Sequence, residues 1–319
     1  MIIVLVFFCF FAGVLGGALI INCEKVIGYN TVIASTQEVS VTLKDYIRYL
    51  RSMFVMDTEM PVYSNNLKFQ EAMIKELLLA MYFYENADDA AKKQAFQDAA
   101  ADLAKRKNFM ESESVGSFEQ LLKEMKITQK EVLDSLAYQH IIKLTLKNKI
   151  TEEMIKDRYI NDLKADKDTY TIATVRSILI AMHPNGKEPR SEEETLRIAE
   201  EVYSRLKNGE DFAALAKLYT DEEELKESGG FLGEISIASW FPELKNTVSE
   251  LEENEFSAPV KSSLGYFLFK VEEKNVKSLE EAENEIIEKI SAEEYYRIIN
   301  DELPEKINRF VIPVKYEGS

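Results

Sequence analysis

Two strings of sequence decide the fold of this chain: YTDEEELKESGGFLGE at residues 219–234 and APVKSSLGYFLFKV at residues 258–271. The first is a polar run that ends in a glycine pair, and the second is an apolar, hairpin-like end built around Gly265. The string VRSILI lies upstream, inside an alternating segment, 171–182, that predicts a strand. Helical patterns fill the gaps, and the order β-α-α-(β)-α-β-β predicts an α+β fold in which helices flank an antiparallel sheet.

The part of the chain before residue 165 is dominated by helical patterns. A β-branched stretch at 26–34 predicts a short strand. Thr42 then precedes apolar residues spaced i, i+3, i+4 and i+7, and Ser117 and Thr128 each begin a capping box. These signals predict several helices that share a core.

The segment after the second string returns to a helical pattern. A capping box at Ser278 begins a helix that is expected to run to about Leu303, before Pro304. A short β-like tail is predicted at 310–316.

The length, composition and net charge of the chain exclude some classes of function. The 319 residues suffice for two or three domains, and 46% hydrophobic with 30% charged residues is typical of globular proteins. The net charge of −17 argues against nucleic-acid binding, which needs clustered Lys and Arg. Cys9 and Cys23 are the only cysteines, so no intrachain disulfide framework is expected. No metal-binding or P-loop pattern is present in the sequence, so no metal, cofactor or nucleotide is predicted.

The N-terminus is the least ambiguous segment. Residues 1–21 carry no charged side chain and are long enough to cross a bilayer as a helix. We predict that residues 1–23 are an uncleaved signal anchor or a cleaved signal peptide, with a buried core helix as the weaker alternative. With either form of signal the rest of the chain is exported, to a periplasmic or cell-surface location, and the anchor places it at the cytoplasmic membrane.

The strings around Gly229-Gly230 and Gly265, together with VRSILI, resemble the parvulin (PpiC, or rotamase) family of peptidyl-prolyl isomerases. The helical patterns and apolar N-terminus resemble the extracytoplasmic foldases SurA and PrsA. The resemblance implies a helical chaperone domain at 26–165 and a parvulin-like domain at 170–273. It also implies that residues 276–319 return to the chaperone domain.

The resemblance also assigns site residues. The first histidine of the family falls at Ser177 and the second at Phe267. Its Cys or Asp falls at Glu222, directly after the usual Asp at Asp221, and its supporting hydroxyl falls at Ser262. Glu222 either takes over the carboxylate role or is simply a solvated acid. The candidate catalytic residues are therefore substituted at both histidine positions.

The proline-binding slot of the family is a Met and a Phe, and these fall at Trp240 and Leu244. These two residues either form an apolar floor for a substrate or pack in a core. The candidate catalytic positions are Glu222, Ser177 and Ser262. The candidate substrate-binding positions are Trp240, Leu244, Phe267 and Asp221.

Two functions from different classes remain open, with a membrane-anchored scaffold for a particular partner as a weaker third. One is a parvulin-type isomerase, with a degenerate site, that assists the folding of exported proteins. The other is an ATP-independent holdase whose parvulin domain only binds peptide or is structural. Unfolded or Xaa-Pro-containing exported polypeptides are the expected partners of both.

Overall fold

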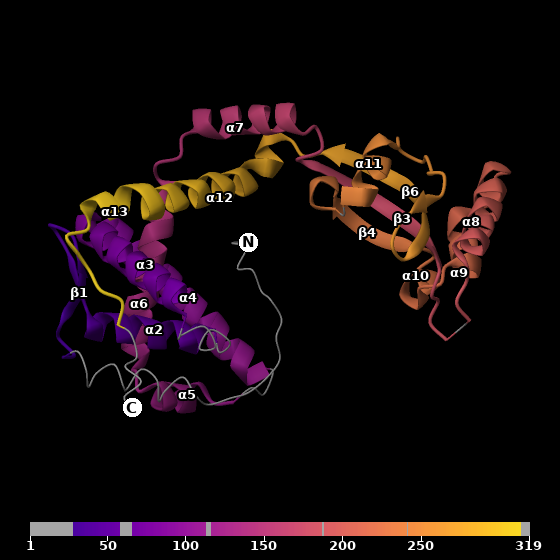
Figure 1. Ribbon diagram of the computed structural model, residues 1–319. Helices are drawn as coiled ribbons and strands as arrows, with labels where there is room; N and C mark the ends of the chain where they lie inside the picture. Colours follow the sequence, from indigo (N-terminus) through magenta and orange to yellow (C-terminus); the bar gives the residue numbers. More distant parts are fainter. Residues whose placement is uncertain (1–27, 58–65, 113–115, 187, 241, 314–319) are drawn as a thin grey trace. The chain divides into compact units, whose positions relative to one another are not determined.

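The computed structural model describes residues 28–57, 66–112, 116–186, 188–240 and 242–313 (Figure 1). The chain divides into two compact units. The helical unit is Met1–Thr151 with Ile287–Ser319, and the sheet unit is Glu152–Ile286. The predicted anchor or signal at 1–23 lies outside the described residues. Among the residues that are described, no helix combines the length and apolarity needed to span a membrane.

The helical unit packs helices against a small antiparallel sheet of order β2-β1-β7. Its strands are β1 (Val32–Ser35), β2 (Ser40–Thr42) and β7 (Arg309–Phe310). Its helices are α2 (Leu43–Met56), α3 (Leu67–Asn86), α4 (Asp89–Ser112), α5 (Phe118–Met125), α6 (Gln129–Lys147), the end of α12 (Leu279–Arg297) and α13 (Leu303–Lys306), with a π-helical turn at Ile298–Glu302 between the last two.

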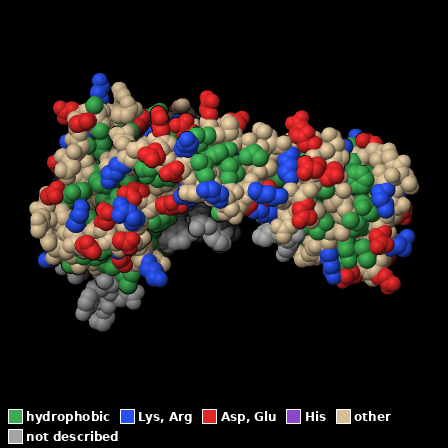
Figure 2. Space-filling view, turned by 90° about the horizontal axis from the view of Figure 1, so that it is seen from above, with side chains coloured by type: hydrophobic (Ala, Val, Ile, Leu, Met, Phe, Trp, Pro, Cys, Tyr) green, Lys and Arg blue, Asp and Glu red, His purple; other side chains and the backbone are tan. Residues whose placement is uncertain are grey.

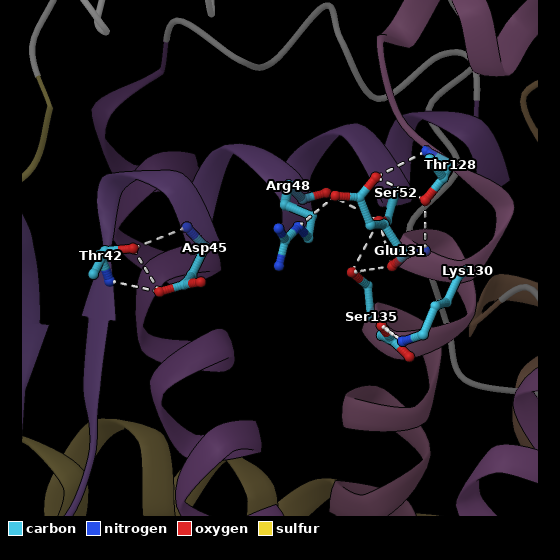
Figure 3. Close-up of polar contacts among 9 residues, drawn as sticks. Thr42, Asp45, Arg48, Ser52, Thr128, Lys130, Glu131 and Ser135 are labelled. Atoms are coloured by element: carbon cyan, nitrogen blue, oxygen red, sulfur yellow. Dashed lines mark hydrogen bonds and ion pairs between the residues drawn. The ribbon is translucent and has the colours of Figure 1, made fainter. Parts of the chain in front are cut away.

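The predicted capping signals begin these helices. Thr42 and Asp45 form a reciprocal capping box at the start of α2, and Thr128 and Glu131 form one at the start of α6 (Figure 3). Each box satisfies two amide groups that have no partner within the helix. Both helices then bury an apolar face in the core that the elements of this unit share.

The C-terminal segment completes the small sheet. Phe310 of β7 pairs with Ala34 of β1, so the last described strand lies beside the first one (Figure 1). This strand is shorter than the predicted tail, whose last residues lie outside the described part. The first strand also begins later than predicted, at Val32, because residues 28–31 form a turn.

The sheet unit is built around an antiparallel sheet of order β4-β3-β6-β5. The central pair is β3 (Thr171–Ala181) and β6 (Gly265–Val276), and β4 (Phe231–Ser236) and β5 (Val260–Lys261) are the edges. The helices are α7 (Glu152–Ala165), α8 (Glu192–Lys207), α9 (Phe212–Tyr219), α10 (Glu223–Glu227), α11 (Pro242–Glu250) and the start of α12, with a 3-10 turn at Ile237–Ser239.

Each face of this sheet has its own core. On one face Ile178, Ile180 and Leu268 pack with residues of α8 and α9. On the other face Val175 and Phe269 pack with residues of the 3-10 turn and α11. The alternation of side chains along β3 and β6 produces this division.

Two glycines allow the strands to approach closely. Gly230 has φ +83°, and a Cβ atom built on it would lie 2.5 Å from the backbone oxygen of Ser177. Gly265 has φ +147°, and its Cβ would lie 2.1 Å from the oxygen of Ile180. Only glycine combines these backbone conformations with such contacts.

The α+β class and the antiparallel sheet are confirmed. The residues after the glycine pair, predicted mainly as a loop, form edge strand β4, because pairing with β3 supplies hydrogen bonds that the local sequence does not signal. Strand β6 extends five residues beyond the predicted string, to Val276, along the same partner strand.

Candidate functional site

One face of the sheet gathers most of the apolar candidate residues. The ring centroids of Trp240 and Phe269 lie 5.0 Å apart at an interplanar angle of 70°, and those of Phe267 and Phe269 lie 5.5 Å apart and nearly parallel. Leu244 of α11 is buried in the same core, and Trp240 and Phe267 are half-buried against it. We call Trp240, Leu244, Phe267 and Phe269 the aromatic face.

Ser177 shares this face of the sheet. In the β3–β6 register it lies opposite Phe269, while Leu179 lies opposite Phe267, so all four side chains point to the same side. The amide of Ser177 donates to the carbonyl oxygen of Gly230 at 2.8 Å. Its Oγ is buried and has no hydrogen-bond partner. A buried polar atom without a partner is uncommon in proteins and costs stability.

Asp221 is buried rather than open to a ligand. Its side chain is 1% exposed, forms an ion pair with Arg190 and accepts a hydrogen bond from the amide of Ala181 at 3.1 Å. Its own amide donates to the oxygen of Leu179 at 2.9 Å. These contacts bind the loop after α9 to the end of β3.

Glu222 and Ser262 lie at the ends of other elements. Glu222 is exposed at the N-terminus of α10, where its side chain makes no capping hydrogen bond. Ser262 is bound within the β5–β6 turn, where its hydroxyl accepts from the amide of Leu264 at 3.1 Å and donates to the oxygen of Gly265 at 3.2 Å. The contacts of these two residues do not join them to the aromatic face.

Neither histidine of the chain lies on this face. His140 is on α6 of the helical unit, where its Nε2 contacts Asp102 at 3.0 Å. Burial and the nearby Lys143 lower its pKa. His183 is exposed after β3. The described residues contain no cluster of metal-ligating side chains.

The sequence did not single out Phe269, and it did not connect Arg190 with Asp221. Phe269 follows Phe267 by two residues in a strand, and this spacing could have placed both rings on one face. The pairing of Arg190 with Asp221 joins residues 31 positions apart, and no local pattern signals it.

The sheet unit is thus a four-stranded antiparallel sheet with helices on both faces and glycines at the points where strands approach closely. Residues 178–273 match the family described as "Rotamase: PPIC-type PPIASE domain". This match confirms the resemblance to parvulin-type isomerases that the two strings of sequence indicated.

Relatives of the chain carry foldase or chaperone names. The chain is 27% identical over 320 residues to "Foldase protein PrsA" of Caldanaerobacter subterraneus subsp. tengcongensis, covering 96% of both chains. It is 39% identical over 97 residues to "Chaperone SurA" of Pseudomonas savastanoi pv. phaseolicola, covering 30% of this chain and 22% of that one. A crystal structure of the peptidylprolyl isomerase PrsA from Bacillus cereus has a TM-score of 0.42 and 21% identity over 90% of this chain and 97% of that one. The sequence matches confirm the resemblance to a SurA/PrsA-like architecture.

Proposed function

We propose that this chain is an extracytoplasmic foldase of the parvulin isomerase family that assists the folding of exported polypeptides. The rotamase match at residues 178–273 and the near full-length similarity to a protein named as a foldase support the proposal. The observation that carries it is the aromatic face, which gathers Trp240, Leu244 and Phe267 at positions that the resemblance assigns to substrate binding.

The chemistry of the aromatic face suits binding better than proton transfer. Rotation about an Xaa-Pro bond is slow because the amide resists twisting, and a catalyst must bind the twisted form more tightly than the planar one. Trp240 and Phe267 offer apolar surface for a proline ring. Ser177 is the one hydroxyl among the candidate residues on that face, and it is buried. We therefore infer a degenerate isomerase site with weak activity, in which binding of the ring contributes most.

A second candidate is an ATP-independent holdase whose rotamase domain binds peptide or is structural. The observation that favours it is the location of both histidines, His140 and His183, away from the aromatic face. The side chain of Asp221 is also buried in an ion pair with Arg190, so its carboxylate does not reach a substrate. In this case clients are held by the helical unit.

Location is part of the proposal. The apolar residues 1–23 would direct export and, if they are retained, anchor the chain in the membrane. The net charge of −17 would keep the exported part soluble. Figure 2 shows acidic and basic side chains interspersed with hydrophobic ones over the face that it presents.

The test is a protease-free isomerisation assay of the full chain on a panel of Xaa-Pro peptides. We expect measurable acceleration and a loss of about tenfold or more in kcat/KM for Trp240→Ala, because truncation of a half-buried aromatic anchor removes much of a binding site. Glu222→Gln tests the proposed carboxylate role. Glu223→Gln, at an exposed acid in the same helix, is its matched control.

The result that would overturn an isomerase is the absence of acceleration while hydrogen exchange shows β3 and β6 still protected. A proline-free client then distinguishes the alternative. Suppression of its aggregation would establish a holdase, and failure to suppress would remove both candidates.

A further inference from the structure

A cavity of about 120 Å³ opens in the helical unit among α2, α3, α4 and α6. Tyr49, Leu77 and Ser135 are buried in its lining. Asp45, Tyr84 and the remaining lining residues are half-buried, so the cavity has a wall that a ligand can reach. A volume of this size accommodates several water molecules or the end of one long side chain.

Aromatic rings form much of this wall. Tyr84 and Tyr138 meet edge to face, with ring centroids 5.0 Å apart and an interplanar angle of 90°, and Phe96 of α4 adds a third ring. The faces of such rings attract cations within about 6 Å. The chain already places one ammonium group there, since Nζ of Lys92 lies 5.2 Å from the ring centroid of Tyr84.

Two carboxylates, Asp45 and Asp134, complete the lining. Oδ2 of Asp45 accepts from the amide and hydroxyl of Thr42 at 3.0 and 2.6 Å (Figure 3). Oδ2 of Asp134 accepts from Lys130 at 2.7 Å. These contacts leave Oδ1 of each carboxylate able to accept. The Lys130 side chain is 78% exposed, and an ion pair of this kind on a helix surface is weak because water screens it. A ligand cation can therefore compete for Asp134.

The one basic side chain in the lining, Arg48, is already paired. Its Nε lies 2.9 Å from Oε1 of Glu131 (Figure 3). Partial burial opposes ionisation of Glu131, but hydrogen bonds from Thr128 and Arg48 lower its pKa and keep it charged. Glu131 thus offsets the charge of Arg48, so the lining contains no unpaired basic side chain and offers the carboxylates of Asp45 and Asp134 to a ligand.

The pKa of Tyr138 also responds to both carboxylates. Burial raises its pKa, and the neighbouring Tyr84, Asp45 and Asp134 raise it further. Both carboxylates therefore act on the same aromatic wall.

We propose that this cavity binds the cationic side chain, lysine or arginine, of an unfolded client polypeptide. The aromatic wall supplies cation–π contacts, and the free oxygens of Asp45 and Asp134 accept hydrogen bonds from the ammonium or guanidinium group. The inference rests on the proposed function for the nature of the client, but it needs no isomerase activity. It gives the helical unit a preference for basic segments in addition to apolar ones.

The test is fluorescence anisotropy of the full chain with a labelled, proline-free 12-residue peptide that contains three lysines. The same peptide with Nε-acetylated lysines is the reference. We expect the lysine peptide to bind at least about fivefold more tightly, and Asp134→Asn to remove most of this preference without weakening the acetylated peptide. Asp134 takes no part in a helix cap, so this variant is expected to fold.

Two further variants keep the proposal falsifiable. Glu111→Gln removes one exposed acid of the same unit outside the cavity, and should leave the preference unchanged. Tyr84→Leu removes a ring without altering charge, and should reduce the preference. Equal binding of the two peptides, binding of neither, or an equal loss in Glu111→Gln and Asp134→Asn would overturn the proposal. Because the peptide lacks proline, a failed isomerase assay leaves this result unaffected.

Discussion

The helical unit and the sheet unit treat their interior polar groups differently. In the helical unit, polar side chains join the helices: Oγ of Ser52 donates to Oγ of Ser135 at 2.9 Å, and the hydroxyl of Tyr49 donates to Glu76 at 2.5 Å. In the sheet unit, Ser177 lies beneath the aromatic face with no partner for its hydroxyl. The first unit joins separate helices through buried side-chain hydrogen bonds. In the second, buried polar side chains such as Asp221 and Ser257 bind strand amides, and glycines let the strands approach closely.

This difference shows where each unit tolerates change. A sheet whose strands are held by backbone pairing and by Gly230 and Gly265 keeps its shape when side chains on its surface are replaced. Ser177 and Phe267, which the resemblance assigns to the family's histidine positions, both lie in the paired strands of this sheet. A helical unit joined by side-chain hydrogen bonds tolerates fewer substitutions, because replacing one partner leaves the other buried without a hydrogen bond.

The largest expected loss of stability comes from substitution of a glycine at which two strands approach closely, Gly230 or Gly265. Gly230→Ala should destabilise the sheet unit by about 3 kcal/mol or more, since its Cβ would meet the backbone oxygen of Ser177 at 2.5 Å in addition to the strain of positive φ. Gly209→Ala is the matched control, because Gly209 has φ +88° but no atom within 4 Å of the added Cβ. We expect it to cost about 1 kcal/mol.

Hydrogen exchange with mass spectrometry measures this effect unit by unit. In Gly230→Ala, amides of β3 and β6 should lose protection while α3 and α6 keep theirs. An equal loss in both units would contradict the view that the framework of the sheet unit stands on its own. Equal costs for the two substitutions would show that the close contact at Gly230 relaxes.

The next largest loss of stability is expected at Glu76 and the residues that donate hydrogen bonds to it, which we call the polar junction of the helical unit. Glu76 accepts hydrogen bonds from Tyr49, Gln139 and, at 3.3 Å, from Tyr295 of α12. Glu76→Ala should cost about 2–3 kcal/mol, because it leaves the hydroxyl of buried Tyr49 without an acceptor. Glu76→Gln keeps an acceptor oxygen and should cost less. Urea denaturation followed by circular dichroism gives the comparison, and equal costs would contradict the role of the hydrogen bonds.

The same junction predicts how the helical unit responds to alkali. Burial and the charge of Glu76 raise the pKa of Tyr49 well above its usual value. A folded-state pKa above the unfolded value of about 10 means that the stabilisation is present below that pH and is lost as the pH rises above it. Tyr49→Phe should reduce this alkaline loss. An unchanged slope would assign the loss to other groups.

Local signals in the sequence predicted most of the elements. Thr42, Thr128 and Ser278 begin helices as their capping patterns indicated, because a cap is decided within four residues. The alternation of β3 and the need for glycine at 230 and 265 were likewise visible in the strings that resemble the rotamase family.

Features that depend on contacts between residues far apart in the sequence could not be predicted from local patterns. Strand β4 exposes Phe231 and Leu232 and exists through its pairing with β3. The buried state of Asp221 depends on Arg190, and the cavity of the helical unit requires residues from four helices. The resemblance named candidate positions, but only the three-dimensional arrangement separates those on the aromatic face from Glu222 and Ser262.

The smallest expected effect compares two buried serines of the sheet unit. The hydroxyl of Ser257 accepts from the amide of Phe269 at 2.9 Å, whereas that of Ser177 has no partner. Ser257→Ala should therefore cost about 1–2 kcal/mol, and Ser177→Ala should be neutral or stabilise slightly, because it removes a buried polar atom without breaking a hydrogen bond. Fluorescence of Trp240, the single tryptophan, reports unfolding of this unit directly.

The two serine variants also bear on function. If Ser177→Ala folds as stably as the parent chain and loses isomerase activity, the unpaired hydroxyl acts on substrate, and its lack of a partner is the cost of that role. If both stability and activity are unchanged, the hydroxyl of Ser177 has no role in catalysis or stability, and the residue only packs in the core. A cost for Ser177→Ala equal to that for Ser257→Ala would mean that its hydroxyl is hydrogen-bonded in solution, and the difference between the two serines would then disappear.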